Sequence, residues 1–280
     1  MEVRTMRYKT IMVQLDVDVR AAQRLQFACE LALRFDAGLI GFAAAEPRLI
    51  DPSDVDGATS VDLVAIQTEE IEARLEEREK EFRTMTAGVT RASWRGEIGH
   101  PTKLLAIHAR AADLIVTGAG TPDLMGNSHR LVKHGALILA AGRPVLLASG
   151  SGKTVKGERI VIAWKDTREA RRSVSDAMPF LVRAQDVLVT TIEENDSISG
   201  NESVADVASY LIEHGVKARS QVIGVGHADA AFALNEVARE IGADMIVSGG
   251  YGHSRLRELI FGGVTRSLLR ESSLNRLISN

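Results

Sequence analysis

Four glycines near the end of the chain have the spacing of a loop that could bind a ligand. The segment contains, in order, Gly249, Gly252, Gly262, Gly263, Val264 and Thr265. Glycine has no Cβ, so a loop built on it allows close approach of the backbone to a ligand. An apolar strand pattern precedes the loop and a helix pattern follows it, and the first amides of that helix, with the Thr265 hydroxyl, could bind an anion. The pattern predicts an anion-binding loop.

Two other segments resemble nucleotide loops but lack residues that the chemistry needs. GSGKT, at residues 150–154, resembles the end of G-x-x-x-x-G-K-[ST], but Leu147 replaces the first glycine and a strand pattern follows instead of a helix. We interpret GSGKT as a flexible linker. SGGYGH, at residues 248–253, resembles the S-G-G-x-D-S loop of adenylating enzymes, but Gly252 and His253 replace its Asp and Ser. An adenylating activity therefore loses support.

The chain repeats itself. KTIMVQLDVDVRAA from Lys9 resembles ERIVIAWKDTREAR from Glu158, with Ile160 standing 149 positions after Ile11. ADLIVTG and ADMIVSG also match, with Ala243 standing 131 positions after Ala112. The first half is thus about 18 residues longer between the two matches, an excess that falls around residues 46–87. We predict domains at 1–149 and 158–280, joined by a linker at 150–157.

Short apolar strands alternate with amphipathic helices in each half. In the second half we expect strands at RIVIAW, DVLVTTI, ARSQVIG and DMIVSG, and helices over residues 168–183, 204–214 and 229–241, with Gly215 as a C-cap. Continuous apolar strands separated by helices are typical of a parallel sheet covered on both faces. Ligands of such sheets bind beyond the carboxyl ends of the strands.

The extra segment of the first half, IQTEEIEARLEEREKEF, predicts a long helix. Its apolar stripe contains Ile71, Leu75, Phe82 and Met85, while pairs such as Glu70–Arg74 and Glu76–Lys80 support the other face. We interpret it as a solvated cover, although the stripe could also contact a partner.

Composition excludes several classes of protein. The 280 residues are 45% hydrophobic and carry a net charge of −3, which gives no electrostatic basis for binding nucleic acid. We expect no membrane segment and no leader, and a cytoplasmic location, because long apolar runs are absent and Cys29 is the single cysteine. Cys29 has the spacing of a buried helix residue. His100, His227 and His253 lie in no zinc-binding pattern.

DMIVSGGYGHSRLRELIFGGVTRSLL resembles the C-terminal segment of universal stress proteins, whose motif is G-x2-G-x9-G-[ST], and VIAWKDTREARR resembles their first strand and helix. The resemblance covers essentially the whole chain as a tandem pair. It implies two Rossmann-like α/β domains, each with a five-stranded parallel sheet of order 3-2-1-4-5. It also implies that ATP binds between the turn after the first strand and the glycine loop.

The resemblance carries over unevenly. Gly249, Gly252 and Gly262 match the loop around the ribose and phosphates, whereas Gly263 replaces its Ser or Thr. The acidic position after the first strand is Lys165, followed by Asp166, and either residue could take part in binding. In the last strand, Asn275-Arg276 replaces Pro-Val.

The first half keeps the acidic residue, as Asp16, but Thr121, Leu131 and Val132 replace three loop glycines. We therefore expect ATP, with or without Mg²⁺, in the second half only.

Three functional hypotheses remain. The leading one is a regulatory, non-catalytic stress-response protein that binds an adenine nucleotide. The others are a structural or protein-interaction module without a nucleotide, and a slow ATPase using His253. We expect the two halves to pair as an intramolecular pseudo-dimer, and a further homodimer is plausible.

Overall fold

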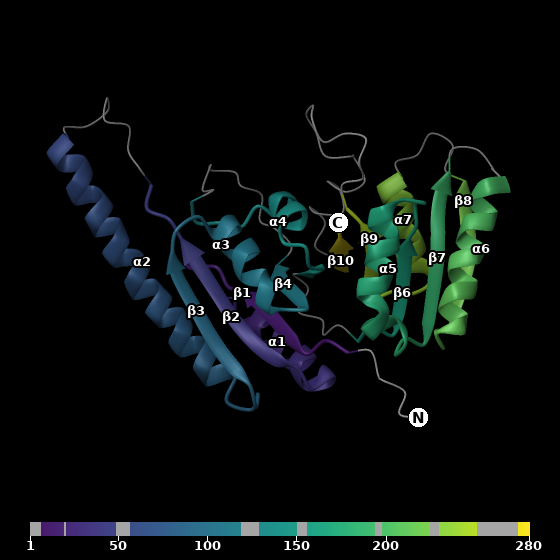
Figure 1. Cartoon of the computed structure of the whole chain (residues 1–280), viewed down its shortest axis with the longest axis horizontal. Helices are drawn as coiled ribbons and strands as arrows, with labels where there is room; N and C mark the ends of the chain where they lie inside the picture. The colour runs from purple at the N-terminus through teal and green to yellow at the C-terminus, as the bar shows by residue number, and fades with distance from the viewer. Residues whose placement is uncertain are drawn as a thin grey trace. The chain divides into compact units, whose positions relative to one another are not determined.

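The computed structural model of the chain describes residues 7–19, 21–48, 57–118, 129–149, 156–193, 198–224, 230–250 and 274–280. Its elements, in chain order, are β1 (Thr10–Gln14), α1 (Ala22–Phe35), β2 (Gly38–Ala45), α2 (Gly57–Met85), β3 (Ala92–Ile98), α3 (Pro101–His108), a 3-10 turn (Ala109–Ala111), β4 (Leu114–Gly118), α4 (His134–Ala140), β5 (Val145–Ala148), β6 (Arg159–Ala163), α5 (Arg168–Leu181), β7 (Asp186–Glu193), α6 (Ile198–Glu213), β8 (Ala218–Gly224), α7 (Ala230–Glu240), β9 (Met245–Gly249) and β10 (Asn275–Ser279) (Figure 1). Strands and helices alternate, so the predicted α/β class is confirmed.

The chain forms two compact units. The first-half unit comprises residues 9–117 and 121–141, and the second-half unit comprises residues 142–280 with Met1–Tyr8 and Gly118–Gly120. The second-half unit therefore includes β5, which the predicted boundary at residue 149 places in the first domain. The predicted boundaries remain a prediction.

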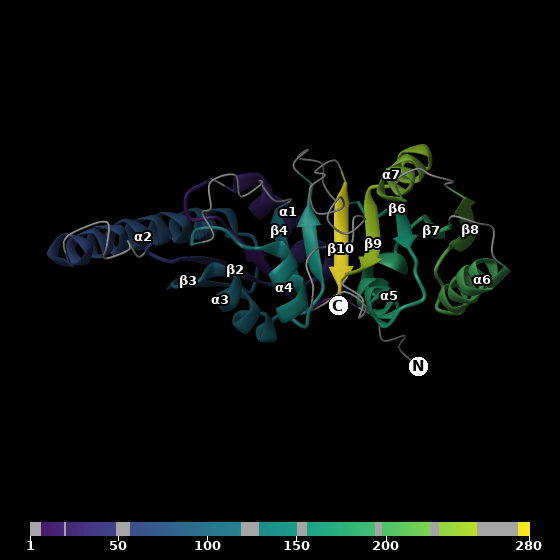
Figure 2. The same ribbon diagram turned by 90° about the horizontal axis from the view of Figure 1, so that it is seen from above.

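The first-half unit is built on four parallel strands in the order β3-β2-β1-β4. Helices α1 and α2 lie on one face of this sheet and α3 and α4 on the other (Figure 2). β2 is buried along its whole length, as expected for a strand with both faces covered. This arrangement brings the carboxyl ends of β1 and β4 side by side.

The second-half unit has the order β5-β10-β9-β6-β7-β8. Strands β6 to β10 are mutually parallel and show the predicted order 3-2-1-4-5. β10 lies beside β9 (Figure 2), and on its other side β5 pairs with it in the antiparallel direction. The Asn275-Arg276 variation therefore lies within a regular strand, where both side chains are buried.

The strands confirm both repeat alignments. β1 and β6 are related by a shift of 149 positions at both ends, and β4 and β9 by a shift of 131. Leu15 and Trp164, one residue past these first strands, make equivalent backbone bonds, to Phe42 O at 2.8 Å and Thr190 O at 2.7 Å.

The extra length of the first half lies mainly in α2, which has 29 residues against 16 in α6. Ile71, Leu75 and Phe82 are buried, as predicted, but Met85 is only half-buried. Arg78 is also buried, which the stripe did not predict, and it forms ion pairs with Glu77 and Glu81. The predicted Glu70–Arg74 pair forms at 2.7 Å.

Two smaller predictions concern helix ends and the cysteine. Gly215 has φ +80° after α6, as a helix-ending glycine should, but α6 begins at Ile198 rather than near Val204. Cys29 is half-buried rather than fully buried, and desolvation raises the pKa of its thiol.

Candidate functional site

The predicted binding residues lie at the carboxyl edge of the second-half sheet. Lys165 and Asp166 follow β6, and Gly249 ends the adjacent β9. The remaining predicted residues lie outside the described part of the chain: Gly252, Gly262, Gly263, Val264 and Thr265. His227 and His253 also lie outside it. The structure therefore bears on three of the eight predicted residues.

Gly249 lies directly against the start of α5. A Cβ at this position would lie 2.6 Å from the Ala170 nitrogen and 2.7 Å from the Glu169 carbonyl carbon. Both are backbone atoms of the first turn of α5, so they could not move aside cheaply. The absence of a side chain at Gly249 thus allows α5 to begin close to the end of β9. Among the described residues, the neighbours of Gly249 on this side are backbone atoms of Glu169 and Ala170.

Lys165 and Asp166 are both exposed but differ in their contacts. Asp166 accepts a hydrogen bond from the Arg171 guanidinium, so part of its charge is already compensated. Within the described residues the Lys165 ammonium forms no ion pair. Among the described residues, Lys165 is therefore an exposed cation without an ion pair.

A buried hydroxyl lies where β6 ends. Thr190, which is 1% exposed, stands opposite Ala163 in the β6–β7 pairing. Its Oγ1 has no hydrogen-bond partner among the described residues. Buried hydroxyls normally have a partner, so this group is a candidate donor or acceptor for a ligand at this edge.

The first-half sheet has a different carboxyl edge, filled by what we call the Arg24 cluster: Gln14, Asp16, Arg24, Thr117 and His134. Arg24 Nη1 donates to the Gln14 carbonyl oxygen at 2.8 Å and to its Oε1 at 2.7 Å, and Nη2 donates to Asp16 Oδ2 at 2.9 Å. Gln14 Nε2 donates to Asp16 Oδ1 at 3.0 Å. Both carboxylate oxygens of Asp16 are therefore engaged by the protein.

His134 completes the cluster. The Thr117 hydroxyl donates to Gln14 Oε1 at 2.9 Å, and His134 Nε2 lies 3.2 Å from the same hydroxyl oxygen. Since the hydroxyl's one hydrogen goes to Gln14, His134 Nε2 must carry a hydrogen and donate it. Desolvation and, to a smaller extent, the nearby Arg24 charge lower the pKa of His134, whereas Asp16 raises it, and together they bring the pKa to about 4. His134 is therefore neutral at physiological pH.

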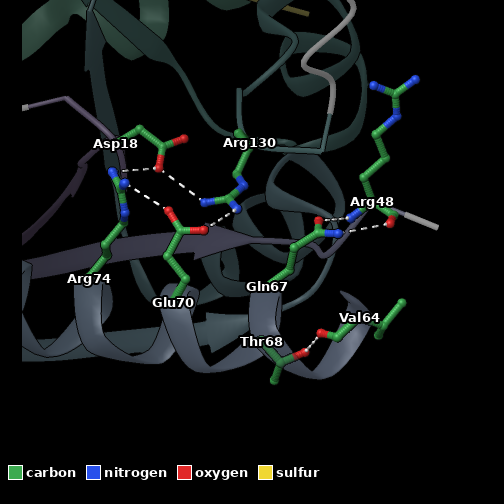
Figure 3. Close-up of polar contacts among 8 residues, drawn as sticks. All are labelled: Asp18, Arg48, Val64, Gln67, Thr68, Glu70, Arg74 and Arg130. Carbon is green, nitrogen blue, oxygen red and sulfur yellow. Dashed lines mark hydrogen bonds and ion pairs between the residues drawn. The ribbon is translucent and has the colours of Figure 1, made fainter. Parts of the chain in front are cut away.

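A second group, the Asp18 cluster, ties α2 to the loops at this edge. It comprises Asp18, Glu70, Arg74 and Arg130 (Figure 3). Asp18 Oδ1 lies 3.1 Å from Arg74 Nη1 and 3.0 Å from Arg130 Nη1. Glu70 lies 2.7 Å from Arg74 and 3.8 Å from Arg130, which closes a ring of alternating charges.

The repeat alignment shows that the second half lacks the Arg24 cluster. The same shifts replace Gln14 by Ala163, Asp16 by Lys165, Arg24 by Ser173, Thr117 by Ser248 and His134 by Thr265. Three large polar side chains become small ones. The sequence analysis did not identify Gln14, Arg24, Thr117 and His134 as a cluster. The signal that was available is Gln14 itself, a polar residue within the apolar run IMVQL.

Comparisons with known proteins agree with this architecture. The model of the universal stress protein family matches residues 7–135 and 159–278. The chain belongs to the universal stress protein family. No curated protein matches the chain. In the described helices, none is both long enough and apolar enough to cross a membrane, and no group of three or more His, Cys, Asp or Glu in that part could hold a metal ion.

Solved structures of the family have a similar fold. A universal stress protein from Archaeoglobus fulgidus DSM 4304 has a TM-score of 0.71 at 14% identity, covering 97% of this chain and 96% of that chain. A putative universal stress protein from Pseudomonas aeruginosa UCBPP-PA14 has a TM-score of 0.57 at 16% identity, covering 97% and 93%. A universal stress protein in complex with cAMP is 23% identical over 52% of this chain and 100% of that chain, with a TM-score of 0.37.

The carboxyl edges of the two sheets present different groups. In the second half, the described residues at this edge include an exposed cation, Lys165, and the buried Thr190 hydroxyl. In the first half, each carboxylate oxygen of Asp16 accepts a hydrogen bond, from Arg24 or from Gln14, while Leu131 and Val132 are half-buried. The described residues at the two edges therefore differ in charge and in size.

Proposed function

We propose that this protein is a stress-response protein that binds an adenine nucleotide at the carboxyl edge of its second half, and that it is regulatory rather than catalytic. The ligand is ATP, with or without Mg²⁺. One observation carries the proposal: the repeat places Ala163 and Ser173 in the second half where Gln14 and Arg24 fill the first.

Each predicted residue has a role in this proposal. Lys165 would bind a phosphate oxygen, since its ammonium is exposed and forms no ion pair in the described part of the chain. Gly249 would set the distance between β9 and α5, and Asp166 would act through Arg171. Gly252, Gly262 and Gly263, followed by Val264 and Thr265, would form the loop around the phosphates.

Isothermal titration of the full chain with ATP and Mg²⁺ tests the proposal, and we expect one site per chain. Gly262→Leu should abolish binding while the protein remains folded, whereas Gly88→Ala should bind normally because a Cβ at Gly88 meets no atom within 4 Å. A parallel titration with cAMP and GTP defines the ligand. No heat, together with no nucleotide in the natively purified protein, would contradict the proposal.

A structural or protein-interaction module without a nucleotide is the second candidate. The Asn275 side chain favours it, because its Oδ1 accepts from the Ser149 N–H at 2.9 Å and its Nδ2 donates to Asp244 O at 3.0 Å. The first bond joins the residue after β5 to the last strand, and the second joins the last strand to the residue before β9. Partners captured equally by the wild type and by a Gly249→Ala, Gly252→Ala variant would favour this candidate.

The slow ATPase alternative rests on His253. Phosphate release that the wild type shows and His253→Ala abolishes would support it, and no release above background from the wild type would reject it.

Light scattering of the eluting protein would separate a monomeric chain from a homodimer, and cell fractionation would test the cytoplasmic location.

A further inference from the structure

We propose that the carboxyl edge of the first-half sheet is a guanidinium-binding site and that the Arg24 side chain is its ligand, supplied by the chain itself. This inference goes beyond the proposed function, because it concerns the half that is not expected to bind a nucleotide. It rests only on the Arg24 cluster, whose residues are all described.

The acceptors match the planar fork of a guanidinium. Gln14 O, Gln14 Oε1 and Asp16 Oδ2 receive the two terminal nitrogens of Arg24 at 2.8, 2.7 and 2.9 Å. A guanidinium presents its donors in one fixed plane, and an ammonium cannot reproduce that geometry. Arg24 Nε has no partner among the described residues, so a guanidinium with an alkyl group at that nitrogen would lose no contact there.

The acceptors are held in place by contacts that do not involve Arg24. Gln14 is 4% exposed and Thr117 is 1% exposed, and the Thr117 hydroxyl fixes Gln14 Oε1 at 2.9 Å. Gln14 Nε2 in turn fixes Asp16 Oδ1 at 3.0 Å. Removing the Arg24 side chain should therefore leave a preorganised set of oxygens rather than a collapsed one.

The second half has no residue equivalent to Arg24 that could enter such a site. Arg24 is the third residue of α1, a helix that begins at Ala22, whereas its counterpart Ser173 is the sixth residue of α5. Ser173 is buried and its hydroxyl donates to Ala170 O at 2.8 Å, within its own helix. The second half thus has neither the guanidinium nor the acidic acceptor, because Lys165 replaces Asp16.

Chemical rescue tests the site. Arg24→Ala removes the equivalent of ethylguanidinium, so the variant should melt on the order of 5–10 °C lower than the wild type. Ethylguanidinium at about 10 mM, an illustrative concentration well below denaturing levels, should restore at least half of that loss by binding the folded state. Ethylammonium at the same concentration should restore none. The matched control is Arg172→Ala, an exposed arginine paired with Asp176, which should respond to neither compound.

Further variants separate this site from a merely structural arginine. Adding Asp16→Asn to Arg24→Ala should abolish the rescue, because the charged acceptor is lost. Equal effects of the two compounds, or an unchanged melting temperature in Arg24→Ala, would overturn the proposal. If Arg24→Ala does not fold, the coupling between Arg24→Lys and Asp16→Asn is measured in a double-mutant cycle, and a coupling near zero would overturn it. No nucleotide is used, so the result is independent of ATP binding in the second half.

Discussion

His134 is the residue whose protonation would disturb the Arg24 cluster most directly. Its Nε2 donates to the Thr117 hydroxyl, and the positive Arg24 guanidinium lies close enough to lower the pKa of His134. A second positive charge in this desolvated cluster would be repelled by the first. The cluster is thus built around a neutral histidine.

Stability should therefore depend on pH through His134. Its pKa is about 4 in the folded protein, against an ordinary value of 6.5, so between these two values only the unfolded chain takes up the proton. We expect the wild type to lose about 2 kcal/mol of unfolding free energy, relative to His134→Gln, as the pH falls from 7.5 to 4.5. Urea unfolding at both pH values measures this difference. An identical loss in both proteins would show that His134 has no such role.

Gly249 gives a second prediction at the residue scale. Gly249→Ala places a Cβ 2.6 Å from the Ala170 nitrogen, so α5 must shift. We expect a loss of roughly 1–3 kcal/mol in unfolding free energy, typical of overpacking. Gly88→Ala, whose Cβ has no neighbour within 4 Å, is the control and should be neutral or slightly stabilising. Equal stability of the two variants would contradict the close approach of β9 and α5.

At the scale of elements, Asp18 and Thr167 stand at equivalent positions before α1 and α5 but make different contacts. Thr167 caps α5, accepting a hydrogen bond from the Ala170 N–H at 3.3 Å. Asp18 stands at the equivalent position and is equally suited to capping, but its carboxylate pairs with Arg74 and Arg130. The first helix consequently begins at Ala22, after Ala21, without a side-chain cap.

The Asp18 cluster should make the attachment of α2 sensitive to salt. Asp18→Ala removes a carboxylate shared by two arginines, and we expect a loss of about 1 kcal/mol at low ionic strength. Because the side chains are partly exposed, the loss should shrink in high salt. Denaturant unfolding in roughly 0.05 M and 1 M NaCl measures both effects. Arg83→Ala, in the exposed pair with Glu79, is the control and should change little.

At the scale of the molecule, the last strand joins segments from the two sequence repeats. β5 comes from the first repeat but belongs to the second-half unit, where Leu146 stands opposite Leu277. Tyr8 belongs to the same unit, and its hydroxyl donates to Asp176 O at 2.6 Å. The second-half unit therefore includes two segments, at Tyr8 and at β5, that precede the second repeat in the sequence.

Asn275→Ala should weaken this unit. The variant leaves the Ser149 N–H and the Asp244 carbonyl oxygen without the partner that Asn275 supplies, and Asn275 is only 3% exposed. We expect a loss of about 1–3 kcal/mol in unfolding free energy, together with faster hydrogen exchange at the amides of β5. Gln26→Ala, which removes an exposed amide bonded to Glu30, is the control. Unchanged exchange in β5 would contradict this role.

Sequence pattern and family resemblance together predicted much of the fold. Both repeat alignments, the strand ARSQVIG, the positive φ of Gly215 and the parallel order of β6 to β10 follow from apolar runs, turn residues and family resemblance. These features depend on neighbouring residues or on one recurring pattern. The repeat alignment likewise showed that Lys165 replaces the acidic Asp16 in the second half.

Only the tertiary structure decided how the side chains at the two edges are used. Arg24 could have faced solvent, Asp18 could have capped α1, and nothing in the sequence showed that Gly249 lies against the start of α5. Each outcome depends on atoms brought together from distant segments, such as Gln14 with Thr117 and Asn275 with Ser149. The amino-acid sequence therefore determined the repeated parallel architecture, whereas long-range hydrogen bonds and backbone contacts decided that the first edge is filled from within.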